Sequence, residues 1–477
     1  MSGFSSNEIS VIERKIEVKD NISKLSTDID YYYEIDRCVN WLKEKQLHKV
    51  CLQFPDYLLC DSVAVALHIE SKAGFQPYIL GDTSYGSCCV DVVAAQHVKA
   101  DGIIHFGHAC LSPTSGLPIL YIFEKFQIDV HQFTKSFRHT FTDTSKKFLL
   151  FFAVEYQHAI DDIITDISSE YHLTVTTLAT ATPIVSNSDD NKSMIGGRWF
   201  TLPNNTILEE YYIVFIGNDG PTLFNIGLTL QGMQLFLYDP SGDQQLKVYS
   251  TTNSKFLMKR MYLVERVKDA TTLGILVGTL GVSNYLESVN RVKQLAKLRG
   301  KKCYIIAVGK PNVAKLANFP EIEVFVLVAC PENSLMDSKE FFQPIVTPYE
   351  LEIACNARKW TERYVLEFQN LLSGATDYQE TDSSVDDFGD VSLVSGRVRS
   401  MAITDSTESV DATDAVALKN DGTISTVLST GSKFLSERSW QGLEINLGRN
   451  QATIATQGRT GIPSKYDTDH ETMETTK

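Results

Sequence analysis

Short apolar runs, rich in β-branched and aromatic residues, alternate along the chain with stretches whose apolar positions recur at helical spacing. This alternation is typical of parallel α/β units, in which helices connect neighbouring buried strands. The pattern occurs three times, in blocks of roughly 110 residues that share little residue identity. We therefore expect an α/β fold of three related domains, each with a short parallel sheet.

The predicted elements follow a similar order in the three blocks. Strands are expected at 48–54, 76–82, 101–107 and from Ile119 in the first block, at 147–154, 173–179, 211–217 and 233–239 in the second, and at 273–279, 301–309 and 324–330 in the third. Helices are expected at 56–74, 90–100, 155–171 and 283–299, and the polar stretch 186–199 is expected to be a loop or excursion. Ser283 is placed to cap the last helix, whose apolar face would carry Leu286, Val289, Val292, Leu295 and Leu298.

These elements predict an N-terminal extension at 1–30, α/β domains at 31–142, 143–262 and 263–373, and a tail at 374–477. The tail lacks periodicity, contains 17 acidic against 9 basic side chains, and is expected to be mostly disordered. Its charge is expected to belong to a solvated linker. The segment 436–448, with Trp440 and Leu443, could dock back onto the body of the protein.

The overall charge and hydropathy exclude several classes of protein. A formal charge of −15 argues against binding to nucleic acid or to an anionic membrane. The N-terminus has no apolar core of a signal peptide, and no apolar run approaches the roughly 18 residues that span a bilayer. We expect a soluble cytoplasmic protein, in which cysteine spacing indicates metal or redox chemistry more often than disulfides.

Three cysteine positions follow predicted strands, where functional groups of parallel sheets collect. Cys88 and Cys89 lie in the glycine-bearing loop GDTSYGSCCVD, Cys110 lies in HFGHACLSP, and Cys330 ends the strand VFVLVAC. These thiols could bind a metal, or they could be small residues at tight turns. No C-x-x-C pair and no common ferredoxin or zinc spacing is present, so the fold itself would have to assemble a site.

The neighbouring histidines leave the type of site open. His105 and His108 flank Cys110 and could complete a Cys/His zinc site. Alternatively, His105 packs or hydrogen-bonds the loop, and His108 donates to a thiolate or cluster sulfur. The remaining cysteines fall within predicted helices or strands and are expected to pack as small hydrophobic residues: Cys38, Cys51, Cys60, Cys303 and Cys355.

Other nucleotide-binding and catalytic motifs are missing from the sequence. It has no P-loop and no G-x-S-x-G, and no G-x-G-x-x-G follows a predicted strand. The glycines of GILVGTLGV, from Gly274, could approach an anion at a strand-to-helix turn, although a tight turn alone also explains them.

Several segments together resemble one known family. LQFPDYLL, GDTSYGSCCVD, HFGHACLSP, VACPENSL, PIVTPYELEIACN and SWQGLE are similar to the diphthamide biosynthesis protein 2 family, over residues 30–375 and the terminal SWQGLE segment. Members of this family form the second subunit of the eukaryotic enzyme that starts diphthamide formation. The resemblance implies three related α/β domains around a [4Fe–4S] cluster held by three cysteines.

The resemblance also implies an activity and partners. Catalytic members cleave S-adenosylmethionine reductively at the open iron, and the 3-amino-3-carboxypropyl radical adds to a histidine of translation elongation factor 2. The implied partners are the first subunit, in a heterodimer, and a small iron-binding protein that donates electrons. The implied metal ligands are Cys110, Cys330 and either Cys88 or Cys89, with the other cysteine of the pair expected to pack.

One departure from the family pattern changes the expected role of the chain. Catalytic members take one cluster cysteine from each domain, but no cysteine occurs here between Cys110 and Cys303. We therefore expect a non-catalytic subunit whose cluster helps to reduce the cluster of its partner. The alternatives are that the chain itself cleaves S-adenosylmethionine, or that it is a structural scaffold without a working cluster.

Overall fold

The computed structural model describes residues 28–81, 88–114, 116–180, 192–203, 206–249, 254–309, 311–336, 341–360 and 363–375, with Tyr378 and short pieces at 390–392, 394, 396, 398–399, 461–462 and 465–466. The chain divides into two units, Met1–Gly422 and Thr423–Lys477. In the second unit a short hairpin pairs β19 (Gly461–Ile462) with β20 (Lys465–Tyr466). The predicted docking segment 436–448 lies outside the described residues.

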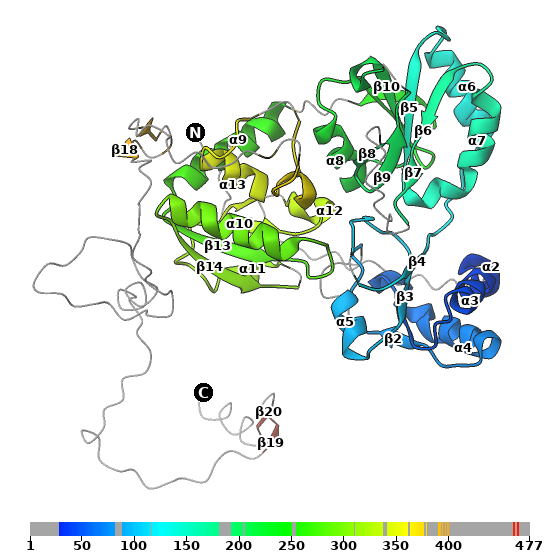
Figure 1. The fold of residues 1–477 in the computed structure, drawn as a ribbon, viewed down its shortest axis with the longest axis horizontal. Helices are drawn as coiled ribbons and strands as arrows, with labels where there is room; N and C mark the ends of the chain where they lie inside the picture. Colours follow the sequence, from blue (N-terminus) through cyan, green and yellow to red (C-terminus); the bar gives the residue numbers. More distant parts are fainter. Residues whose placement is uncertain are drawn as a thin grey trace, which may run out of the picture. The chain divides into compact units, whose positions relative to one another are not determined.

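The first unit contains three four- or five-stranded sheets, each with its own helices (Figure 1). The first sheet has the order β2-β1-β3-β4, and all its pairs are parallel. Its elements are α2 (Ile29–Tyr32), α3 (Ile35–Glu44), β1 (Val50–Gln53), η1 (Asp56–Asp61), α4 (Ser62–Ala73), β2 (Tyr78–Leu80), α5 (Val92–His97), β3 (Gly102–Phe106) and β4 (Ile119–Ile122).

The second sheet has five strands in the order β12-β11-β10-β5-β6, and only β12 is antiparallel. A three-stranded antiparallel sheet, β7-β9-β8, follows β6 in the chain. The elements are α6 (Val130–Thr140), β5 (Lys147–Phe152), η2 (Val154–Ala159), α7 (Ile160–Ile167), β6 (His172–Val175), β7 (Thr177–Leu178), β8 (Lys192–Ile195), β9 (Arg198–Thr201), η3 (Leu208–Glu210), β10 (Tyr211–Ile216), α8 (Pro221–Thr229), β11 (Leu235–Tyr238) and β12 (Leu246–Tyr249).

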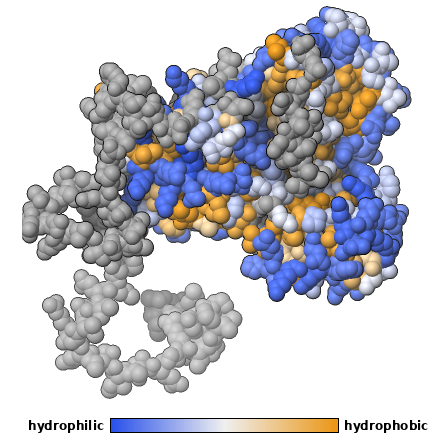
Figure 2. Space-filling model, viewed as in Figure 1, coloured by the Kyte–Doolittle hydropathy of each residue, from blue (hydrophilic) through white to orange (hydrophobic). Residues whose placement is uncertain are grey.

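The third sheet has the order β14-β13-β15-β16 and is again parallel. Hydrophobic side chains reach the surface over this part of the chain (Figure 2). Ile305, on the edge strand β14, is exposed. The elements are α9 (Ser254–Asp269), β13 (Thr272–Val277), α10 (Tyr285–Leu298), β14 (Lys302–Ala307), α11 (Val313–Leu316), β15 (Val324–Val328), α12 (Pro331–Ser334), β16 (Ile345–Val346), α13 (Pro348–Ala354) and η5 (Phe368–Asn370), followed by the short pair β17 (Asp390–Val391) and β18 (Val398–Arg399).

The three sheets share one strand order. Numbered from its first strand, each sheet reads 2-1-3-4: β2-β1-β3-β4, β6-β5-β10-β11 and β14-β13-β15-β16. This is the structural repeat that the sequence pattern predicts, and it confirms the α/β class. Its consequence is that the third strand of every sheet, β3, β10 or β15, ends at an equivalent point. The loops that follow these strands are therefore candidates for a shared site.

The strands form where the sequence is apolar at consecutive positions. Strand β5 reads Lys-Phe-Leu-Leu-Phe-Phe, and every residue after Lys147 is buried. A strand covered on both faces needs no polar–apolar alternation, which is why such continuous runs mark central strands of parallel sheets. Helix α4 ends at Gly74, whose φ of 84° is the left-handed conformation that terminates helices.

The stretch 186–199, expected to be a loop or excursion, contributes β8 and β9 to the small antiparallel sheet from residue 192 onward; residues 186–191 lie outside the described part. Two other local predictions were wrong. Helix α10 begins at Tyr285, so Asn284, with φ 65°, occupies the N-cap position and Ser283 lies one residue too early to cap the helix. The backbone N–H of Ser283 donates to the carbonyl of Pro113 (2.7 Å). Leu286 is exposed, so the buried face of α10 is formed by Ser288, Val289, Val292, Leu295 and Ala296.

Among the described residues, no helix is both long and apolar enough to cross a membrane.

Helix α9 spans the predicted domain boundary at 262–263, and it packs on α13 and on β16 of the third sheet.

Candidate metal centre

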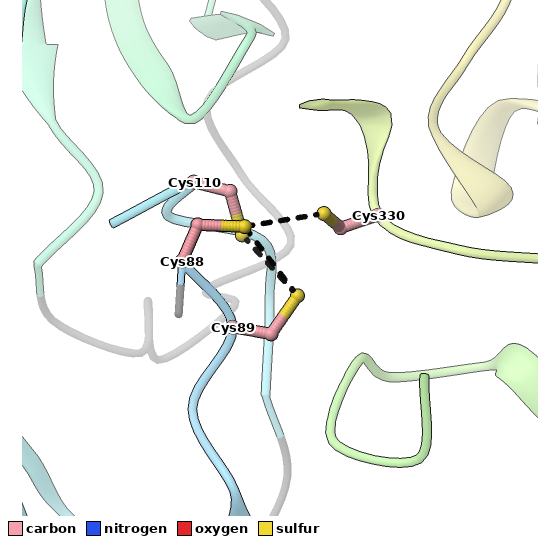
Figure 3. Close-up of side chains that lie close together, drawn as sticks. All are labelled: Cys88, Cys89, Cys110 and Cys330. Carbon is pink, nitrogen blue, oxygen red and sulfur yellow. Dashed lines mark hydrogen bonds between the residues drawn. The ribbon is translucent and has the colours of Figure 1, made fainter. Parts of the chain in front are cut away.

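Four cysteines from separate parts of the chain meet at one buried point. The Sγ atoms of Cys88, Cys89, Cys110 and Cys330 all lie within 4.8 Å of one another. Figure 3 shows the side chains of the first three pointing toward that of Cys330, which comes from the other side. Cys110 follows β3 and Cys330 follows β15, so two members of the group lie after the third strand of their sheets. The structure thus brings together the four thiols that the sequence places after predicted strands.

The distances within the group are short. Cys88 Sγ lies 3.9 Å from Cys89 Sγ and 3.7 Å from Cys330 Sγ, and Cys89 Sγ lies 3.8 Å from Cys110 Sγ. Both members of the adjacent pair thus point into the group, although the sequence led us to expect that one would pack elsewhere. Which of them ligates a metal stays a prediction.

Buried backbone and side-chain contacts hold these loops in place. The Gln53 side chain donates to the carbonyl of Cys89 (2.7 Å) and accepts from the N–H of Asp91 (2.9 Å). The N–H of Cys110 donates to the carbonyl of Cys88 (3.1 Å). Gln53 is fully buried at the end of β1, and its role could not be predicted from the sequence because a lone glutamine fits no metal-binding motif.

Two glycines let other segments approach these loops. A Cβ on Gly281 would lie 2.2 Å from the carbonyl oxygen of Val90, and a Cβ on Gly197 would lie 2.9 Å from that of Cys110. Gly197 also has φ +72°, which a residue with a side chain rarely adopts. The close packing of Gly281 beside the cysteine loop accounts for this glycine of the GILVGTLGV turn without any anion.

Two side chains make hydrogen bonds to the sulfurs. Asn333 Nδ2 donates to Cys88 Sγ (3.1 Å) and to Cys330 Sγ (3.4 Å), and Cys110 Sγ donates to Ser112 Oγ (3.3 Å). Asn333 was not predicted from the sequence. Its position three residues after Cys330, in the short helix α12, is nevertheless a signal that it could contact that cysteine. Donors of this kind adjust the basicity and redox potential of metal-bound sulfur.

The thiols affect one another's protonation. Hydrogen bonds from Cys330, Cys88 and Cys89 hold the pKa of Cys110 well below its usual value. Hydrogen bonding to Cys110 and to Cys330, together with burial, holds the pKa values of Cys88 and Cys89 well above theirs. A buried group of this kind retains most of its protons until a cation compensates the charge, so metal binding would release protons.

The two histidines do not lie where a Cys/His zinc site would need them. His105 is fully buried, its Nε2 lies 3.1 Å from the carbonyl oxygen of His108, and burial lowers its pKa to about 4. It therefore packs and hydrogen-bonds the loop. The two ring nitrogens of His108 lie 2.8 Å from Glu155 Oε1 and 2.7 Å from Glu332 Oε2, so both face carboxylates and not a sulfur. The expectation that His108 donates to a sulfur was wrong, and neither histidine belongs to the group of potential ligands.

His108 and its two carboxylates form a charged network. Burial disfavours the imidazolium, but the hydrogen bonds to Glu155 and Glu332 prevail and raise the pKa of His108 to about 11. A neutral imidazole has one N–H, so donation to both carboxylates requires the protonated ring. Thr222 completes the network by donating to Glu332 Oε1 (2.6 Å).

A cavity of about 710 Å³ opens beside this network. Its lining includes Cys88, His108, Glu155, Glu332 and Asn333, and glycines that follow strands of the second and third sheets. The cavity is large enough for a small molecule, and it reaches the cysteine group from the side of Cys88.

A second, narrow cavity of about 20 Å³ lies on the side of Cys110, and Glu367 lines it. The N–H of Gly196 donates to Glu367 Oε1 (3.1 Å), but burial prevails and raises the pKa of Glu367 to about 7. Because the folded pKa exceeds the usual 4.5, this carboxyl stabilises the fold fully below pH 4.5, and the contribution is lost as the pH rises through 7.

We expect Glu367→Gln to remove this pH dependence, since glutamine keeps the acceptor oxygen and cannot ionise. Urea unfolding at pH values on either side of 7 should show the variant gaining stability over the parent at the higher pH. The exposed Glu209→Gln provides the control. If the free energy of unfolding changes between the two pH values by the same amount in Glu367→Gln as in the parent, this carboxyl does not titrate as described.

The donor set fits two kinds of metal centre. Four thiolates bind Zn²⁺ in structural sites and also bind [4Fe–4S] clusters. Three of the sulfur separations are 3.7–3.9 Å, and all four Sγ atoms lie within 4.8 Å of one another. The number, type and burial of the donors are suited to either kind of centre.

Comparison with known proteins identifies the family of the chain. A family model for diphthamide synthesis proteins matches residues 54–365, which is more than half of the chain. The chain belongs to the diphthamide synthesis family. Members from Xenopus laevis and Schizosaccharomyces pombe, both named 2-(3-amino-3-carboxypropyl)histidine synthase subunit 2, are 42% and 35% identical to it. The aligned regions cover 97% of this chain in both cases, and 98% and 95% of the two relatives.

A solved structure shows the same fold in another member of the diphthamide synthesis family. The crystal structure of Dph2 from Pyrococcus horikoshii with a 4Fe-4S cluster matches with a TM-score of 0.52 and 20% sequence identity. The match covers 70% of this chain and 92% of the archaeal one. The resemblance inferred from the sequence motifs is thus confirmed at the level of the family and the fold.

Proposed function

We propose that this chain is the iron–sulfur subunit of a complex that carries out the first step of diphthamide biosynthesis. In this reaction a 3-amino-3-carboxypropyl group passes from S-adenosylmethionine to a histidine of translation elongation factor 2. The observation that carries the proposal is the convergence of Cys88, Cys89, Cys110 and Cys330 in a member of this family. The names of the relatives, which describe a subunit of a histidine synthase, support the same reaction.

The proposed cofactor is a [4Fe–4S] cluster held by these cysteines. Such a cluster supplies one-electron chemistry when bound. The chain's own residues would enclose it, since the four cysteines are at most 9% exposed, and would tune it through the amide of Asn333. Support for iron over zinc comes from the Dph2 structure with its 4Fe-4S cluster.

We propose that the chain supports reduction and does not perform the transfer. The second sheet supports this role, because β10 is followed by Gly217 and Asn218, whereas β3 and β15 are followed by the loops that carry Cys110 and Cys330. The electron would pass to a cluster in the first subunit, the heterodimer partner, after delivery by a small iron-binding donor protein in the cytoplasm. Nucleic acids and membranes have no part in this proposal.

Anaerobic purification of the full chain tests the metal assignment. We expect a brown protein with broad absorption at about 400 nm and about four iron atoms per chain. The measurements are the absorption spectrum and elemental analysis for iron and zinc. A colourless protein with stoichiometric zinc would refute the cluster and support the single tetrahedral ion.

The cavity beside Cys88 favours a second candidate function, in which this chain itself cleaves S-adenosylmethionine. The isolated chain, reduced with dithionite under anaerobic conditions, distinguishes the two. We expect no aminocarboxypropyl-derived product without the partner subunit. Product formation by the isolated chain would establish the catalytic alternative.

A further inference from the structure

The His108–Glu332 hydrogen bond joins the loops of two cysteines that lie more than two hundred residues apart in the chain. His108 stands two residues before Cys110, and Glu332 stands two residues after Cys330. We propose that His108, held between Glu155 and Glu332, is a positioning residue that keeps the loop of Cys330 against the loops of the other three cysteines. This inference deepens the proposed function and rests on its metal centre.

The contacts fix one point shared by all three sheets. His108 follows β3 of the first sheet, Glu155 follows β5 of the second, and Glu332 follows β15 of the third. Thr222, at the start of α8 in the second sheet, donates to the remaining oxygen of Glu332 (2.6 Å). Both carboxylate oxygens of Glu332 are therefore engaged, and the side chain cannot rotate away from His108 without breaking a second bond.

The network is short-bonded and largely enclosed. The side chains of Glu155 and Glu332 are only 13% and 10% exposed, and that of His108 is 34% exposed. The three bonds that join them and Thr222 are 2.6–2.8 Å long, and partial burial limits competition from water. This favours a rigid junction over a mobile surface pair.

The same contacts exclude a direct role for His108 as a ligand. Both of its ring nitrogens face carboxylate oxygens, so no lone pair is directed at a metal. Its effect on the centre must pass through the backbone of the two cysteine loops. Metal sites require ligand positions within about 0.2 Å of their ideal distances, so a loosened Cys330 loop should weaken retention of the metal.

The test compares metal retention in the full chain carrying His108→Gln or Glu332→Gln. We expect either variant to lose iron to a chelator under anaerobic conditions about tenfold faster than the parent, and to show an altered electron paramagnetic resonance spectrum after reduction. His68→Gln is the matched control, because His68 pairs with Asp30 (2.9 Å) at an exposed position away from the cysteines, and it should leave both readouts unchanged.

Parental release rates and an unchanged spectrum in folded His108→Gln would overturn the proposal. If His108→Gln does not fold, Glu332→Gln decides alone, since glutamine keeps an acceptor oxygen for Thr222 but places an amide N–H opposite the N–H of His108 and so removes that bond. If the purified protein holds zinc, the proposed function fails, but zinc release measured with a coloured indicator still tests the positioning role in the same variants.

Discussion

Replacing Cys330 with serine should abolish stable metal binding while leaving the fold in place. Cys330 is the member of the group contributed by the third sheet, and its Sγ lies 3.7 Å from that of Cys88. A serine hydroxyl is a harder and poorer ligand than a thiolate for iron–sulfur clusters or zinc. Loss of a hydrogen-bond partner of a metal ligand lowers metal affinity by up to roughly 100-fold. We expect loss of the ligand Cys330 itself to lower metal affinity by more than that.

The matched control is Cys355→Ser. Cys355 is 1% exposed, follows α13 beside the third sheet and lies outside the cysteine group, so the substitution has the same size and a similar burial. Iron and zinc analysis together with the absorption spectrum after anaerobic purification should show metal in Cys355→Ser and little in Cys330→Ser. Equal metal content in both variants would contradict the four-cysteine centre.

A related experiment addresses the scaffold alternative. If all four cysteines are changed to serine and the complex with the partner subunit keeps full transferase activity, the chain acts as a scaffold. The proposed reducing role instead requires a large loss of turnover in that variant, with the partner subunit still bound.

The sequence was a good guide to the strands and a poorer one to the helices. Continuous apolar runs such as Lys147–Phe152 and Val324–Val328 specify buried parallel strands almost by themselves. Helix boundaries are less sharply specified: Ser283 has the right side chain for a cap, but α10 begins one residue later, behind Asn284. The N–H of Ser283 donates to the carbonyl of Pro113 in another loop, and a tertiary contact of this kind is invisible to a periodicity argument.

For the site, strand-end position was informative because the fold repeats. The third strand of each sheet ends at an equivalent point, and Cys110 and Cys330 follow two of these strands. The roles of Gln53 and Glu332 could not be read in the same way. Each acts by reaching a specific atom of a distant loop, and no residue-type pattern encodes that distance.

The middle sheet shows how one fold can carry different chemistry in its repeats. It retains the 2-1-3-4 order and a loop after β10, but this loop has Asn218 and no cysteine. In place of a ligand, this sheet contributes Glu155 and Thr222 to the network around His108. Its role at the metal centre is thus to support the loops that carry the cysteines.

The second large effect is expected at a buried ion pair that supports the third sheet. Arg260 of α9 donates through Nε and Nη2 to the two carboxylate oxygens of Glu350 in α13. The residues are 1% and 0% exposed. Glu350 also accepts the N–H of Thr347 (2.9 Å), which closes the capping box at the start of α13.

We expect Glu350→Gln to destabilise this region by about 3–5 kcal/mol, because the amide keeps the shape and the capping acceptor but leaves the charge of Arg260 buried and uncompensated. The control is Glu170→Gln, which breaks another two-pronged pair, with Arg138, at 41% and 45% exposure. That change should cost no more than about 1 kcal/mol. Hydrogen exchange of the α13 amides measures the local opening free energy in both variants, and similar protection of α13 in the two would show that burial does not strengthen the pair.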